Sequence, residues 1–105
     1  MKEIKAFIHR NRAADVVRAL TGAGHSHLSV ADVKGTLDAL DTKEREYSIE
    51  IGEAAITEVK IELVCEDARA NEAIRLIREN GRTGQRNAGW IYVSDVSDVY
   101  SIDGS

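Results

Sequence analysis

The feature that most constrains the fold is a strand–helix–strand pattern that occurs twice along the chain. In the first half, apolar residues alternate over 2–9, recur with helical spacing from 13 to 20, and are followed by a β-branched run over 28–34. In the second half, alternation over 59–65 precedes helical spacing from 70 to 77 and a further strand over 90–94. This order predicts an α+β, ferredoxin-like βαββαβ fold, with an antiparallel sheet and two helices on one face.

The ends of these elements carry polar residues and glycine. Asn11 and Asp67 are expected to cap the two helices, and glycine follows each helical pattern. A short fifth strand is expected near 100–102.

Composition limits the class of protein. The 105 residues suit a single domain over 1–105. With 14 basic and 18 acidic residues the net charge is −4, which argues against nucleic-acid binding. No apolar stretch is long enough to span a membrane and no signal-peptide region is evident, so a cytoplasmic, non-inserted protein is expected. The single cysteine, Cys65, is expected to be a small buried hydrophobe.

The connector between the two halves is unusually long. Roughly twenty residues, about 36–55, join strands that a hairpin would join with about two to five. Tyr47, Ile49 and Ile51 alternate like a strand, and the stretch D-T-K-E-R-E, which holds Lys43 and Arg45, suits a solvated tip. A loop of this length predicts contact with a partner, and a plain flexible loop is the alternative.

A second loop, G-R-T-G-Q-R-N-A-G-W at 81–90, is rich in glycine and arginine. A P-loop places phosphates at the N-terminus of the helix that follows it, whereas this loop follows a helix and precedes a strand, so it is not a Walker motif. Its glycines permit a nest of backbone N–H groups that binds anions, and its arginines supply charge. An ordinary turn after a helix is the alternative. The residues concerned are Gly81, Arg82, Thr83, Gly84, Arg86 and Gly89.

Several short stretches at consistent separations resemble the PII signal-transduction proteins. They are V-A-D-V-K-G at 30–35, E-V-K-I-E-L-V at 58–64, R-T-G at 82–84, G-W-I-Y-V-S at 89–94 and V-S-D-V at 96–99. The resemblance covers nearly the whole chain. It implies a homotrimer of ferredoxin-like subunits with adenine-nucleotide clefts between neighbours. It also implies that the long connector is a T-loop that docks onto a transporter or enzyme, and that about 81–89 is the B-loop beside the nucleotide phosphates.

Carried over by position, the resemblance implies two sets of site residues. Gly35 would lie against the nucleotide, Glu62 and Val64 would offer backbone near the adenine, and a neighbouring subunit would present Arg82 and Thr83. The nucleotide-binding set is Ser29, Gly35, Glu62, Val64, Arg82, Thr83, Arg86, Gly89 and Trp90, and the partner-binding set is Asp38, Lys43, Arg45, Tyr47 and Ile51.

The chain also departs from the PII pattern. T-L-D-A at 36–39 replaces F-G-R-Q, so that Asp38 stands in place of a basic residue and Ala39 in place of the glutamine that organises Mg-ATP with 2-oxoglutarate. Trp90 replaces a lysine beside the phosphates, and Ile51 replaces the tyrosine that receives uridylyl groups. Each lost charge-assisted hydrogen bond costs about 1.5–3 kcal/mol, so ADP or AMP is expected to be favoured over Mg-ATP, with the need for magnesium left open.

Other functions stay open at this stage. A metal-responsive trimer would use His25 and His27, a further alternative senses another small anion such as bicarbonate, and a third is a weak nucleotide hydrolase. The two histidines are expected to be exposed loop residues, and no metal ligand or catalytic residue is assigned because no nucleophile–base pair is evident. The alternation of Trp90 and Tyr92 predicts a packed sheet face, with stacking on a base as the alternative.

Overall fold

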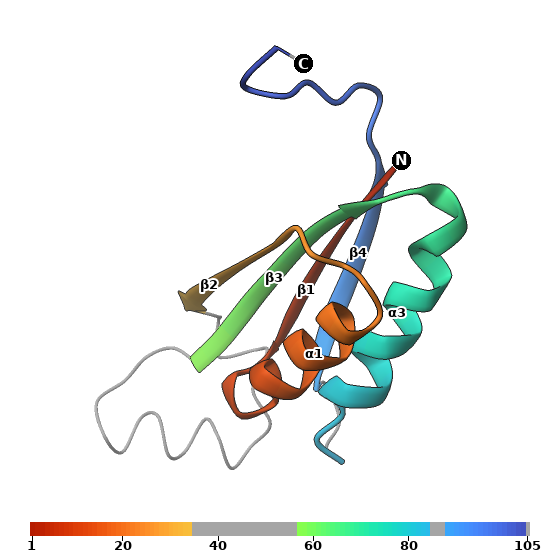
Figure 1. The fold of residues 1–105 in the computed structure, drawn as a ribbon. Coiled ribbons are helices and arrows are strands. Elements are labelled where there is room, and N and C mark those ends of the chain that lie inside the picture. The colour runs from red at the N-terminus through yellow and green to blue at the C-terminus, as the bar shows by residue number, and fades with distance from the viewer. Residues whose placement is uncertain (35–56, 85–87, 105) are drawn as a thin grey trace.

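The computed structural model describes residues 1–34, 57–84 and 88–104. In chain order these residues form β1 (Lys2–His9), α1 (Arg10–Gly22), β2 (Leu28–Lys34), β3 (Thr57–Cys65), α3 (Asp67–Gly81) and β4 (Gly89–Asp95) (Figure 1). The predicted order of strands and helices is therefore confirmed for this part of the chain.

The described strands form a four-stranded sheet in the order β2-β3-β1-β4. Every neighbouring pair is antiparallel, and both helices lie on the same face of the sheet (Figure 1). This is the ferredoxin-like arrangement that the sequence predicts.

The hydrophobic core lies between the helices and one face of the sheet. Because side chains alternate along a strand, the pairing of Ile4 with Leu63 and of Ala6 with Ile61 places the apolar residues of β1 and β3 on the same side. The helical stripes pack against them. The buried apolar residues are Ile4, Ala6, Ile8, Val16, Leu20, Val59, Ile61, Leu63, Cys65, Ala70, Ala73 and Ile77.

The opposite face of the sheet, which we call the open face, carries the alternate residues. Phe7 and Tyr92 meet edge to face there, with ring centroids 6.0 Å apart. Trp90 pairs across β1 and β4 with Phe7 and is 55% exposed. Trp90 and Tyr92 thus lie on a sheet face as predicted, but the helices do not cover it.

Some predicted element ends are wrong. The N-cap position of α1 is His9 and that of α3 is Glu66, and neither makes a side-chain cap bond. Asn11 lies inside the first turn of α1. Asp67 is the first residue of α3, and its carboxylate instead pairs with the N-terminal amine, 3.0 Å away.

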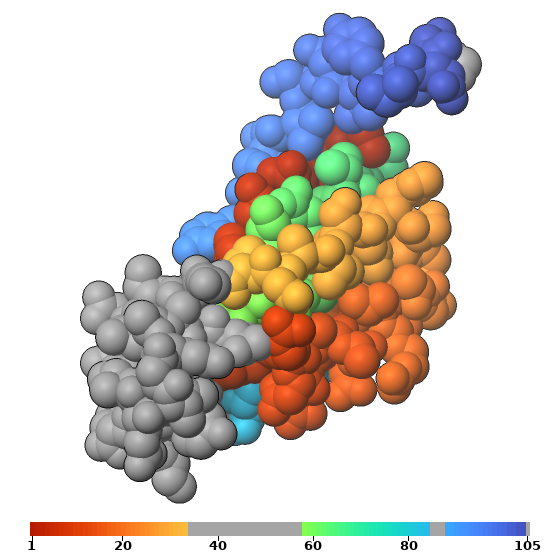
Figure 2. Space-filling view, turned by 90° about the vertical axis from the view of Figure 1, so that its left-hand side faces the viewer, coloured from red at the N-terminus to blue at the C-terminus, as the bar shows by residue number. Residues whose placement is uncertain are grey.

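The predicted fifth strand is also wrong. Pairing of β4 with β1 ends at Lys2 and Asp95, and Val96 donates a last backbone hydrogen bond to the carbonyl of Met1. Residues 100–102 pair with no described strand. The C-terminal tail projects from the body of the protein, and Tyr100 and Ile102 are exposed (Figures 1 and 2). No helix among residues 1–34, 57–84 and 88–104 is both long and apolar enough to cross a membrane.

Candidate functional site

Three of the predicted nucleotide-binding residues lie together at the β2–β3 side of the sheet. Ser29 is the cross-strand partner of Glu62, and Val64 follows on the same face of β3. The three residues line one hollow of about 160 Å³, which we call the β2–β3 hollow, together with Glu3, His27 and Leu63. Lys60 lies 2.8 Å from the Glu62 carboxylate, and this hydrogen bond holds the pKa of Glu62 below its usual range.

The other described members of that set lie where α3 ends and β4 begins. Arg82 directly follows α3, half-buried Thr83 comes next, and Gly89 and Trp90 open β4. A second cavity of about 160 Å³, the α3–β4 cavity, lies between the last turns of α3 and the helix-covered side of β1 and β4. It is lined by Ile8, Ile77, Arg78, Gly81, Arg82, Ala88, Gly89, Trp90 and Ile91.

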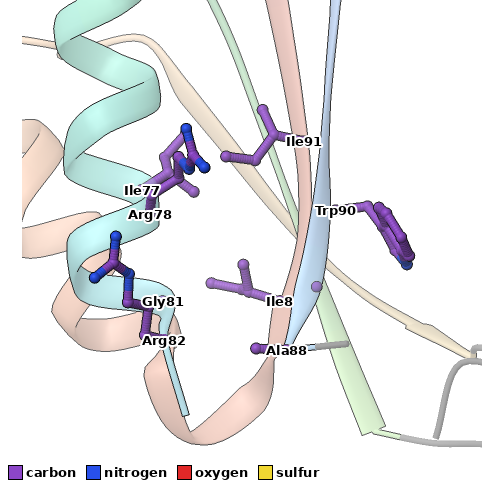
Figure 3. Close-up of a pocket in the computed structure, with 9 residues that line it drawn as sticks. Ile8, Ile77, Arg78, Gly81, Arg82, Ala88, Trp90 and Ile91 are labelled. Carbon is purple, nitrogen blue, oxygen red and sulfur yellow. The ribbon is translucent and has the colours of Figure 1, made fainter. Parts of the chain in front are cut away.

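Side chains around the α3–β4 cavity point in different directions. Ile8, Ala88 and Ile91 point from the sheet toward α3, whereas the Trp90 ring points away, to the open face (Figure 3). Trp90 therefore adds little more than backbone to this cavity.

The two groups of predicted residues do not form one site within a single copy. β1 lies between β3 and β4, so two strand spacings of about 4.8 Å each separate those strands. In register, the Glu62 row of the sheet meets β4 at Tyr92, two residues beyond Trp90. Within one copy the two groups border separate hollows.

Seven predicted residues lie outside the described part of the chain. They are Gly35, Asp38, Lys43, Arg45, Tyr47, Ile51 and Arg86. The same holds for the proposed T-loop, about 36–55, and for 85–87 within the proposed B-loop.

Gly89 and Gly84 of the second loop differ in the structural reason for glycine at each position. A Cβ at Gly89 would lie 2.2 Å from the carbonyl oxygen of Phe7, and its φ is +150°, so close packing against β1 requires glycine there. Gly84 has φ of +83° with open space around it. The conformation of Gly84 suits a nest, whereas Gly89 is required for sheet pairing whether or not a ligand binds.

The prediction that His25 is an exposed loop residue is wrong. His25 is 5% exposed, and its Nε2 atom lies 3.1 Å from Oε1 of Glu72 on α3. The turn after α1, where Gly24 has φ of +95°, carries His25 inward against α3. His27, two residues on, is exposed as predicted.

A polar cluster fixes this histidine in place. Arg69 donates to Glu72 over 2.6 Å and also to the backbone carbonyl of Ala23. The Arg69 guanidinium and then the His25 hydrogen bond hold the pKa of Glu72 below its usual range. We call Arg69, Glu72, His25 and the Ala23 carbonyl the His25 cluster; its members serve packing between α1 and α3.

Metal and thiol chemistry find little support in the described residues. Within 1–34, 57–84 and 88–104, no group of three or more His, Cys, Asp or Glu side chains is placed to hold a metal ion. Cys65 is buried as predicted, and burial raises the pKa of its thiol.

Three residues that line these hollows or hold the His25 cluster together are not among the predicted site residues. Arg78 borders the α3–β4 cavity, His27 borders the β2–β3 hollow, and Glu72 joins Arg69 to His25. The spacing of Arg69 and Glu72, three apart on a helix, was a usable signal for their ion pair. The cavity-lining role of Arg78 had no comparable signal.

Comparison with known proteins gives consistent matches along the chain. Residues 1–104 match the family model described as Nitrogen regulatory protein P-II. Nitrogen regulatory protein P-II 1 of Methanothermobacter thermautotrophicus is 32% identical over 102 residues, covering 97% of this chain and 89% of that protein. Nitrogen regulatory protein P-II of Porphyra purpurea is 33% identical over 106 residues, covering 97% and 91%. That of Pasteurella multocida is 30% identical over 102 residues, covering 97% and 91%.

Proposed function

The chain belongs to the nitrogen regulatory protein P-II family, and from that premise we propose that it forms a homotrimer which binds an adenine nucleotide between subunits. In this proposal it acts as a regulator and not as an enzyme, and it controls a transporter or another enzyme through residues 36–55. The second part follows from the family resemblance alone, because those residues lie outside the described structure.

The observation that carries the nucleotide proposal is the separation of the two residue groups. Ser29, Glu62 and Val64 border the β2–β3 hollow, whereas Arg82 and Thr83 lie beyond the end of α3. In a cleft between copies, the first group would hold the base and ribose and the second group, from the neighbour, would hold the phosphates. Backbone N–H groups and a guanidinium suit phosphate oxygens.

The open face supports association between copies. Val64, Trp90 and Tyr92 are 41%, 55% and 58% exposed there. An antiparallel sheet can leave one face in water, but large aromatic and aliphatic side chains on that face favour its burial against another surface. A symmetric homo-oligomer would cover it with the same face of other copies.

The residues proposed to hold the phosphates favour a nucleotide with fewer phosphates than ATP. The resemblance to the PII proteins implies a lysine at the position of Trp90, whose ring points to the open face, away from the α3–β4 cavity (Figure 3). Among the described residues proposed to hold the phosphates, Arg82 is then the one cation. ADP or AMP is therefore expected to bind more tightly than Mg-ATP.

Calorimetric titration with ADP, AMP and ATP, with and without magnesium, tests the proposal. Arg82→Ala should weaken ADP binding at least tenfold, roughly the loss of one charge-assisted hydrogen bond. Arg75→Ala is the matched control, since Arg75 lies on α3 and pairs with Glu79. Equal ADP affinity in the parent and in Arg82→Ala would contradict the phosphate role.

Light scattering at micromolar concentration tests the assembly. A mass of three chains is expected. A monomer would remove the neighbour on which the proposed cleft depends.

A further inference from the structure

The α3–β4 cavity has apolar walls of a size that suits a small organic molecule. Ile77 from α3 faces Ile8 and Ile91 from the sheet, and Ile8 and Ile77 are almost fully buried (Figure 3). Its volume, about 160 Å³, is close to that of cavities of about 150 Å³ that hold benzene. The cavity is formed within one copy, so the inference does not rest on the proposed nucleotide cleft.

Two arginines border this cavity without an ion-pair partner. Arg78 and Arg82 both line it, and neither makes an ion pair with any residue that the structure describes. Figure 3 shows Arg78 extending from α3 beside Ile77 and facing Ile91. Arg82 extends from the end of α3 back along the helix, away from Ile8 and Ile91, so Arg78 is the arginine whose guanidinium faces the cavity (Figure 3).

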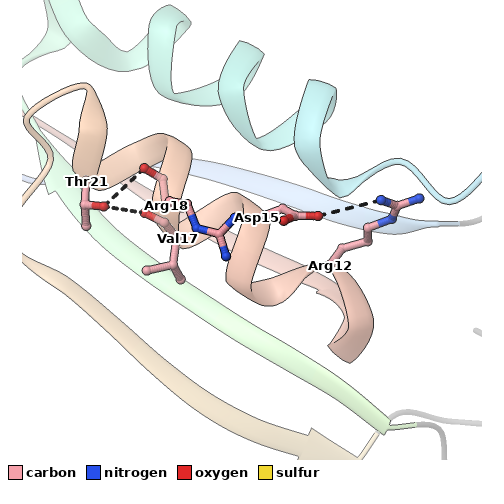
Figure 4. Close-up of polar contacts among 5 residues, drawn as sticks. All are labelled: Arg12, Asp15, Val17, Arg18 and Thr21. Carbon is pink, nitrogen blue, oxygen red and sulfur yellow. Dashed lines mark hydrogen bonds and ion pairs between the residues drawn. The ribbon is translucent and has the colours of Figure 1, made fainter.

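The other described arginines differ in this respect. On α1, Asp15 lies between Arg12 and Arg18, at 3.7 and 3.5 Å (Figure 4). Elsewhere the ion pairs are Arg10 with Asp32, Arg69 with Glu72 and Arg75 with Glu79. The arginines without an acidic partner among the described residues are thus the ones at the α3–β4 cavity.

From this arrangement we propose that the α3–β4 cavity binds a small monocarboxylate with an apolar body. The carboxylate would lie against the Arg78 guanidinium, whose planar donor group matches its two oxygens. The apolar body would replace water on Ile8, Ile77 and Ile91. A monocarboxylate of this kind is favoured over inorganic phosphate because phosphate has no apolar body to cover Ile8, Ile77 and Ile91.

Benzoate is the probe, because it combines one carboxylate with a ring that the cavity volume accommodates. Titration of the full chain, followed by calorimetry and by chemical-shift changes, should give roughly millimolar affinity, as expected for a ligand of this size. Benzyl alcohol keeps the ring without the charge, and acetate keeps the charge without the ring. Each should bind at least tenfold more weakly than benzoate, and so should inorganic phosphate.

Substitutions around the cavity test whether benzoate binds there. Arg78→Ala should weaken benzoate binding at least tenfold while ADP affinity stays within twofold, since Arg78 is not part of the proposed nucleotide group. Ala88→Leu should block benzoate by filling the space into which Ala88 points, with both arginines kept (Figure 3). Arg75→Ala should leave benzoate binding unchanged. Circular dichroism checks that each variant is folded, and the exposed position of Arg78 keeps the test usable if Ala88→Leu is not.

Four results would overturn the proposal. These are no benzoate binding up to about 20 mM, unchanged binding in Arg78→Ala, equal binding of benzyl alcohol, or inorganic phosphate binding as tightly as benzoate. If the parent chain binds ADP, Arg82→Ala loses ADP binding and the parent does not bind benzoate, the proposed function stands and this inference is refuted. Benzoate binding without any ADP binding would give the reverse result.

Discussion

The two ends of helix α3 differ in what their charged side chains contact. At the N-terminal end, Arg69 and His25 both meet Glu72, and Asp67 meets the N-terminal amine. At the C-terminal end, Arg78 and Arg82 border a cavity and have no acidic partner in the described structure.

This difference separates structural charges from charges that are available to a ligand. His25 is buried, so it needs a hydrogen-bond partner, and Glu72 with Arg69 provides one that also fixes the turn after α1. Arg78 and Arg82 are exposed and lose little by staying hydrated. Substitutions at the first end are therefore expected to lower stability, and substitutions at the second end to change binding.

The largest expected effect tests the backbone beyond the C-terminal end of α3. Gly89→Ala should destabilise the fold by at least about 3 kcal/mol, because the new Cβ would lie 2.2 Å from the Phe7 carbonyl oxygen and the positive φ is strained for alanine. Urea unfolding measures the change.

Gly84→Ala is the control for this prediction. It has φ of +83° but nothing within 4 Å, so only the left-handed conformation contributes, at about 1–2 kcal/mol. Equal losses at the two glycines would show that the approach to β1 is looser than described.

The next effect concerns the His25 cluster. His25→Ala should cost about 2 kcal/mol, since it opens a space between α1 and α3 and removes the hydrogen bond to Glu72. His27→Ala, an exposed histidine two residues away, should stay within about 0.5 kcal/mol. A similar loss in both variants would mean that His25 is no more anchored than its neighbour.

The fold was predictable because its signals are local and repeated. Alternation in β1 and β3 and helical spacing in α1 and α3 each placed the apolar residues that the structure buries. The errors came where non-local contacts decide. Asp67 pairs with the N-terminal amine, and the pairing of β4 with β1 ends at Asp95, before residues 100–102.

The candidate site was less accessible from sequence for the same reason. Pattern resemblance selected Ser29, Glu62 and Val64, which the structure does bring together. Buried His25 was missed because its partner Glu72 lies 47 residues away. The cavity beside Arg78 arises from the distance between α3 and β4, which no local pattern encodes.

A smaller effect is expected on stability when Arg69 and Arg78, both on α3, are each replaced by alanine. Arg69→Ala should lower stability by about 1 kcal/mol, because Glu72 and the Ala23 carbonyl lose a donor. The expected loss is no larger because Arg69 is partly exposed, and solvent weakens its ion pair. Arg78→Ala should change stability by less than about 0.5 kcal/mol, because no described ion pair is broken. Thermal unfolding without ligand measures both. A larger loss at Arg78 would reverse the comparison between the two ends.

The smallest expected effect is a pH dependence that involves the N-terminal end of α3. Arg69 and then His25 lower the pKa of Glu72, and the N-terminal amine lowers the pKa of Asp67. The folded chain therefore binds fewer protons than the unfolded chain just below the ordinary carboxyl values of about 3.9–4.3. Stability from both groups is present above those values and is lost as the pH falls through the lower folded pKa values.

Glu72→Gln isolates the part of this pH dependence that belongs to the His25 cluster. The glutamine keeps the shape of the side chain but does not titrate, so the melting temperature should be lower than the parent's at pH 6 by about 2–5 °C. Between pH 6 and pH 3 it should then fall less steeply than in the parent, because one proton-linked contribution is already absent. Glu79→Gln, which breaks the exposed pair with Arg75, is the control and should follow the parent's slope. Parallel curves for the parent and Glu72→Gln would show that Glu72 contributes no acid-sensitive stability, and the N-terminal end would then differ from the C-terminal end in packing alone.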